Sequence, residues 1–119
     1  MEDYIIREID RIGEMLLMIA RKLGLFDGNT PEYSLTDVKE EFDKAGCPID
    51  LDNLLQQENP VLYLVEEEKL SHHGLEMLID IIFHSDLDES RKQSLLDDAI
   101  AYLESKGYFS FRLQSLRSN

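Results

Sequence analysis

The sequence predicts an all-α protein, a compact bundle of five to seven helices that forms a single domain over residues 1–119. Three observations support this prediction. Apolar residues recur at intervals of three and four along most of the chain, which is the period of a helix face. Segments with this period tend to begin at Ser, Asp or Asn and to end at Gly, the residues typical of helix caps. Only one short segment has a strand-like composition, and it has no second strand with which to pair.

The first predicted helix is long, from about Asp3 to Leu23, and it carries the strongest pattern. Its stripe of apolar residues, spaced alternately four and three apart, comprises Ile5, Ile9, Ile12, Leu16, Ile19 and Leu23. This spacing is typical of a coiled-coil seam. The stripe is therefore expected either to pack within the chain or to join two copies in a dimer. Gly24 is expected to end the helix.

Shorter helices are expected between residues 34 and 68. Ser34 and Asp37 are spaced as a capping box for a helix that ends at Gly46. Asp50 is expected to cap a short helix that reaches about residue 58. Residues 61–65 favour a strand by composition, but the Asn-Pro pair before them is a typical helix start, so a helix is predicted.

A helical hairpin is predicted over residues 72–84 and 88–106, with Ser71 as its N-cap and Gly107 as its stop. Its first helix is apolar on most sides, which indicates a central, buried position. The large-and-small residue pattern of this C-terminal hairpin is similar to one tetratricopeptide-type unit. It departs from that pattern because it has no tryptophan, lacks the usual Gly-Tyr in the first helix and has a longer turn.

Three segments of the chain carry a family resemblance. The opening segment 3–16, the hairpin and the tail around Phe109-Ser110-Phe111 resemble a family of short uncharacterised bacterial all-helical proteins. The resemblance covers about two-thirds of the chain and is loose in its middle. It implies an all-helical fold with tetratricopeptide-like character and a bacterial source. It implies no activity and no functional residues.

The charge is strongly acidic and uneven. The net charge is −13, and residues 27–68 alone contain twelve acidic and two basic residues. Such a surface repels phosphate backbones, so no nucleic-acid partner is expected. No signal peptide or long apolar segment is visible, so a cytoplasmic protein with no membrane partner is expected. The acidic middle either aids solubility or docks a basic partner, and the tail after Glu104, which has no acids, is expected to lie against it or against a neighbouring molecule.

The C-terminal aromatic residues are the best candidate for an interface. Tyr108, Phe109, Phe111 and Arg112 lie together in the sequence, and aromatic and Arg side chains often anchor protein interfaces. Alternatively, these rings cover the end of the hairpin core. A last helix is expected from about Phe109, with Phe109, Leu113 and Leu116 facing inward.

Chemistry-bearing motifs give only weak alternatives. A metal site or small enzyme site would have to assemble His72, His73 and His84 with acidic residues, because zinc needs three or four converging ligands. Residues 86–97 begin like a calcium loop but have Arg91 where the turn requires Gly. Cys47 has no neighbour expected to activate a thiolate. No catalytic residue and no cofactor is therefore predicted, and the leading hypothesis is a non-enzymatic helical module that binds a protein partner or itself.

Overall fold

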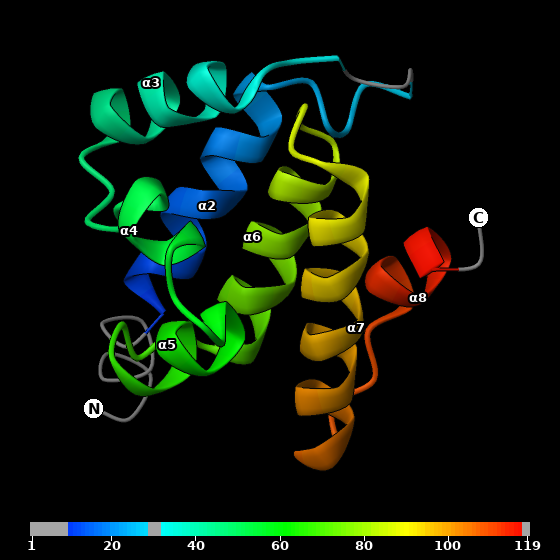
Figure 1. The fold of residues 1–119 in the computed structure, drawn as a ribbon. Coiled ribbons are helices and arrows are strands. Elements are labelled where there is room, and N and C mark those ends of the chain that lie inside the picture. The colour runs from blue at the N-terminus through cyan, green and yellow to red at the C-terminus, as the bar shows by residue number, and fades with distance from the viewer. Residues whose placement is uncertain (1–9, 29–31, 118–119) are drawn as a thin grey trace, which may run out of the picture.

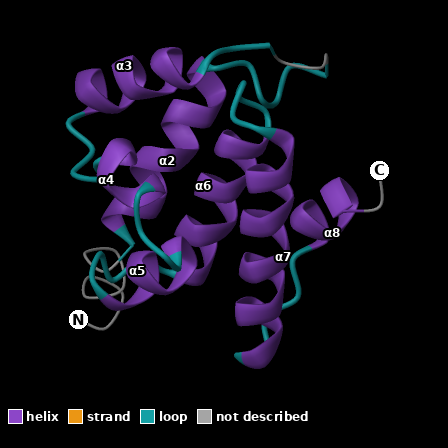
Figure 2. Cartoon of the chain, in the orientation of Figure 1, coloured by secondary structure: helices purple, strands orange, loops and turns teal. Residues whose placement is uncertain are grey.

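Every regular element in the described part of the chain, residues 10–28 and 32–117 of a computed structural model, is a helix. The all-α bundle predicted from the sequence is therefore confirmed, and Figure 2 shows the helices joined by loops. The helices, in chain order, are α2 (Arg11–Lys22), α3 (Leu35–Ala45), α4 (Leu51–Leu55), α5 (Pro60–Glu66), α6 (His72–Phe83), α7 (Glu89–Ser105) and α8 (Phe111–Arg117).

Helix α6 is the centre of the bundle. It contacts α2, α3, α5, α7 and α8, and Figure 1 shows it between α2 and α7. Its apolar residues point in nearly all directions, so only a helix surrounded by others can bury them. The buried apolar side chains of α6 are Leu75, Met77, Leu78, Ile79, Ile81 and Ile82. The described residues pack into a body of 41 × 32 × 30 Å.

The capped ends of α3 and α5 lie where the sequence predicts them. The Ser34 side chain accepts a hydrogen bond from the Asp37 backbone N–H, and the Asp37 carboxylate accepts one from Ser34 N–H, both at 3.0 Å. Gly46 ends α3 with φ +71°, a left-handed conformation that favours glycine. Asn59 caps α5 through Leu62 N–H at 3.2 Å, so the strand-like segment 61–65 is helical as predicted.

The long N-terminal helix that the sequence predicts is interrupted at Asp10. Helix α2 begins at Arg11, and its N-cap Asp10 has φ −97° and ψ 18°, which is not helical. The prediction of one continuous helix from about Asp3 is therefore wrong at Asp10. Residues 1–9 of the chain lie outside the described residues. In α2, Leu16, Ile19 and Ala20 are buried, and the helix packs against α6. This part of the stripe thus packs within the chain rather than facing a dimer partner.

The last helix begins later than predicted, which changes the direction of one aromatic ring. The buried Ser110 side chain accepts a hydrogen bond from Leu113 N–H at 3.1 Å, so Ser110 caps α8 and Phe109 lies before the helix. Leu113 is buried as expected, but Phe109 is exposed, so its predicted inward position is wrong. Helices α6 and α7 form the predicted hairpin, with α8 packed against both.

Candidate functional site

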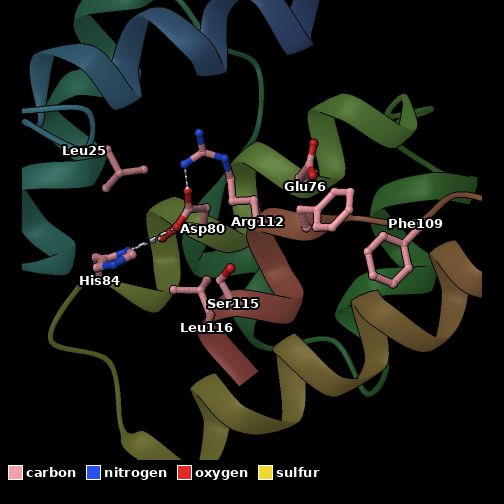
Figure 3. A pocket seen from close by; sticks show the side chains of 9 residues that line it. Leu25, Glu76, Asp80, His84, Phe109, Arg112, Ser115 and Leu116 are labelled. Atoms are coloured by element: carbon pink, nitrogen blue, oxygen red, sulfur yellow. Dashed lines mark hydrogen bonds and ion pairs between the residues drawn. The ribbon is translucent and has the colours of Figure 1, made fainter. Parts of the chain in front are cut away.

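One side of α6 carries a row of polar residues that faces α8. Glu76, Asp80 and His84 are spaced four residues apart, so they lie one above another on a helix. Each contacts either the C-terminal segment or a neighbour in the row. These side chains line a surface pocket of about 670 Å³ together with Leu25, Phe109, Phe111, Arg112, Ser115 and Leu116 (Figure 3).

Asp80 is the buried centre of this row. Its side chain is only 2% exposed, and burial of an unpaired carboxylate is strongly unfavourable. Its Oδ2 accepts a hydrogen bond from Arg112 Nη1 at 2.7 Å, and its Oδ1 lies 3.2 Å from His84 Nδ1. Figure 3 shows Arg112 and His84 reaching Asp80 from two sides. The Asp80 carboxylate therefore fixes both Arg112 of α8 and His84, which caps the C-terminus of α6.

The tautomer and pKa of His84 follow from this contact. Its Nδ1 lies 2.9 Å from the Asp80 carbonyl oxygen as well as near the carboxylate, and both are acceptors, so Nδ1 carries a proton. The hydrogen bond to the Asp80 side chain raises the pKa of His84, while burial and the nearby charge of Lys92 act in the opposite direction. The imidazolium form is thus favoured relative to a free histidine.

Glu76 anchors the segment that leads into α8. It accepts a hydrogen bond from the Tyr108 hydroxyl at 3.1 Å and another from the Ser110 hydroxyl. Burial raises the pKa of Tyr108, and the charge of Glu76 raises it further. The ring of His72 packs edge-on against Tyr108, with ring centroids 5.4 Å apart. Tyr108 is therefore held within the fold and is not a free interface group.

The rim of the pocket presents aromatic rings to solvent. Phe111 is 80% exposed and Phe109 is 56% exposed, and the two rings pack edge to face with centroids 4.8 Å apart. The Arg112 guanidinium lies 4.9 Å from the ring centroid of Phe26, which is also exposed. Leu25 and Leu116 complete the apolar wall. Large rings left exposed together are unusual, because burying each would gain hydrophobic free energy.

The four residues predicted for an interface therefore divide into two pairs. Phe109 and Phe111 are exposed at the pocket rim, whereas Tyr108 and Arg112 are tied to Glu76 and Asp80. The ion pairs of the described tail reach Asp80 of α6 and Asp97 of α7, so they do not join the tail to residues 27–68 of the same chain. Contact of the tail with a neighbouring molecule stays a prediction. The sequence reasoning missed the roles of Glu76, Asp80 and His84.

The histidines proposed as metal ligands are not brought together. His72 and His73 lie at the N-terminal end of α6, whereas His84 caps its C-terminus, about 18 Å along the helix axis. His73 Nδ1 lies 3.7 Å from Glu76, and His72 packs on tyrosine rings. Across residues 10–28 and 32–117, no three His, Cys, Asp or Glu side chains are placed to hold a metal ion. The metal alternative from the sequence is therefore not supported.

The remaining candidates have structural explanations. Burial raises the pKa of the Cys47 thiol, which is opposite to the activation that a nucleophile requires. Asp88 caps α7 through Ser90 and Arg91 N–H groups, so the calcium-like segment begins as a helix cap.

Ten of the twelve acidic residues in 27–68 are exposed and two are half-buried. Among the described helices, none is both long and apolar enough to cross a membrane.

Comparison of the chain with protein-family models, curated proteins and solved structures gave no significant match. The bacterial family resemblance and the tetratricopeptide-like character of the hairpin therefore stay predictions.

Proposed function

We propose that this chain is a non-enzymatic helical module that binds a protein partner through its C-terminal aromatic surface. This surface is defined as Phe109, Phe111 and the adjoining pocket walls Leu25 and Leu116. The observation that carries the proposal is the exposure of Phe111 and Phe109, at 80% and 56%, beside an open pocket. Aromatic side chains of this kind are enriched at the energetic centres of protein interfaces.

The support for a binding surface is stronger because the backbone that carries the two rings is held in place. Ser110, between the two rings in sequence, is buried and bound to Glu76, and Leu113 is fully buried one turn later. Arg112, next to Phe111, is fixed by Asp80. An anchored backbone loses little conformational entropy when a partner covers the rings, which favours binding.

The experiment compares capture of partners by the unaltered protein and by the double variant Phe109→Ser/Phe111→Ser. Immobilised proteins are incubated with lysate of cells that make the chain, and retained proteins are quantified by mass spectrometry. The matched control is Leu62→Ser, which removes an apolar side chain that is 40% exposed on α5. We expect at least tenfold less of the specifically retained partner with the double variant and full retention with the control.

Sedimentation of the purified protein adds the case in which the partner is a second copy. A concentration-dependent dimer that the double variant abolishes supports the same surface. Equal retention of the same partners by the double variant and the unaltered protein, with no change in sedimentation, contradicts the proposal.

A further inference from the structure

The charged groups of the pocket are arranged in two layers. The two carboxylates lie underneath, because the Asp80 side chain is 2% exposed and that of Glu76 is 12% exposed. The Arg112 guanidinium and the His84 imidazole lie nearer the solvent, because Arg112 is 39% exposed and His84 is 23% exposed. Glu76 already receives contacts from Tyr108, Ser110 and His73, and Asp80 from Arg112 and His84. The acids are thus occupied, and the pocket presents hydrogen-bond donors to a ligand.

The donors have unused capacity. A guanidinium has five N–H groups in a planar fork, and the contact of Arg112 with Asp80 is through Nη1. His84 directs Nδ1 to Asp80, so its Nε2 donates to another partner when the ring is in the imidazolium form. The exposed Ser115 adds a hydroxyl to the same lining. A planar carboxylate matches an arginine fork by accepting two parallel N–H···O bonds.

The rest of the lining is apolar. Leu25, Phe109, Phe111 and Leu116 surround the donors, and the pocket volume of about 670 Å³ lies within the range of ordinary ligand sites. A bare inorganic anion would leave these side chains in water. A ligand that combines a carboxylate with a large apolar group satisfies both parts of the pocket.

We propose that this pocket binds a partner peptide at a carboxylate that lies within one residue of a large apolar side chain. The inference rests on the proposed function and names the chemistry of its partner. Arg112, helped by His84, receives the carboxylate, and Phe109 and Phe111 cover the apolar side chain. The net charge of −13 repels anions in general, so binding of an anion here depends on the local donors.

The test uses two probes that differ only in charge, N-acetylphenylalanine and its neutral amide. Each is titrated into ¹⁵N-labelled full-length protein while backbone and Arg112 Nε–H resonances are followed by NMR. Probes of this size bind roughly in the millimolar range. We expect saturable chemical-shift changes confined to the pocket residues. The amide is expected to bind at least fivefold more weakly than the acid, and binding of the acid is expected to weaken in about 0.5 M salt.

Three variants locate the binding. Arg112→Gln is expected to weaken binding of the acid at least fivefold. Phe111→Ala is expected to weaken binding of both probes. The matched control Arg117→Gln removes a cation of the same helix that lies 4.0 Å from Asp97 and does not line the pocket, so it is expected to change neither. The comparison of acid and amide on the unaltered protein remains decisive even if Arg112→Gln disturbs the fold.

Equal binding of acid and amide, shifts that map outside the pocket, or no saturable shift up to about 20 mM probe overturns the inference. This failure is distinct from that of the proposed function. Loss of partner capture by Phe109→Ser/Phe111→Ser together with equal acid and amide binding overturns only the carboxylate recognition.

Discussion

Carboxylates behave differently in two regions of this molecule. In residues 27–68 they are exposed or half-buried, and their hydrogen bonds to the chain are short-range contacts such as the Ser34–Asp37 capping box, although the exposed Asp52 also pairs with Lys39 of α3. In α6, Glu76 and Asp80 instead bind side chains that lie 32 or 34 positions further along the sequence. The same residue type thus serves as surface charge in one region and as an internal anchor in the other. Burial and partners, not composition, decide the difference.

The largest effect that the comparison predicts is at Asp80. Asp80→Asn removes the negative charge that contacts both Arg112 and His84. We expect the free energy of unfolding to fall by about 3 kcal/mol. This value is near the lower limit for breaking a buried ion pair, because Arg112 is partly exposed to water. Urea denaturation followed by circular dichroism measures this. The control Asp43→Asn, an exposed acid of α3, is expected to change stability by less than about 0.5 kcal/mol. Similar losses for the two variants would contradict the distinction between the regions.

The two faces of α8 give the next effect. Leu113→Ala removes a fully buried side chain, and we expect a loss of about 2 kcal/mol because α8 is short and terminal. Phe111→Ala on the opposite face is expected to stay within about 0.5 kcal/mol. Thermal and urea denaturation of the pair of variants measure the contrast. A large loss for Phe111→Ala would mean that its ring is packed and not free for a partner.

Glu76 is expected to contribute less than Asp80. Glu76→Gln keeps the shape and one acceptor oxygen but removes the charge that strengthens the bonds from Tyr108 and Ser110, so we expect a loss of about 1 kcal/mol. Glu66→Gln, at an exposed position of α5, is the matched control with an expected change near zero. Equal denaturation midpoints for the two variants would exclude an anchoring role for Glu76.

The smallest effect is a pH dependence at His84. Its pKa is raised in the folded protein, chiefly by Asp80, so its contribution to stability is fully present below its unfolded pKa and is lost as pH rises through the folded value. We therefore expect His84→Gln to reduce stability more at about pH 5.5 than at about pH 8.5. Urea denaturation of both proteins at both pH values isolates this group, because other titrations cancel. A larger penalty at the higher pH would contradict the assigned contact.

The sequence predicted features that depend on neighbours along the chain. The Ser34, Asn59 and Ser71 caps and the Gly46 and Gly107 stops were predicted because helix ends are set by local hydrogen bonds and backbone conformation. The outward direction of Phe109 was not predicted, because it depends on Ser110 being the residue that caps α8.

The pocket was beyond local reasoning for a related reason. Asp80 and Arg112 are 32 residues apart, and no spacing rule connects them. One signal was present in the sequence: Asp80 is the single charged residue between Met77 and Phe83 in an otherwise apolar segment. A buried acid requires a partner, which predicts an ion pair with an Arg or His elsewhere in the chain. The sequence alone did not indicate which one.

The most direct test of the account is whether the rings of the C-terminal aromatic surface face water in the isolated protein. Solvent paramagnetic relaxation with a soluble nitroxide, measured on ring protons of Phe-labelled protein and methyl protons of Leu-labelled protein, reports this exposure residue by residue. The account predicts strong relaxation of Phe109 and Phe111 and weak relaxation of Leu113, following exposures of 56%, 80% and 0%. Protection of both phenylalanine rings to the level of Leu113 would contradict it.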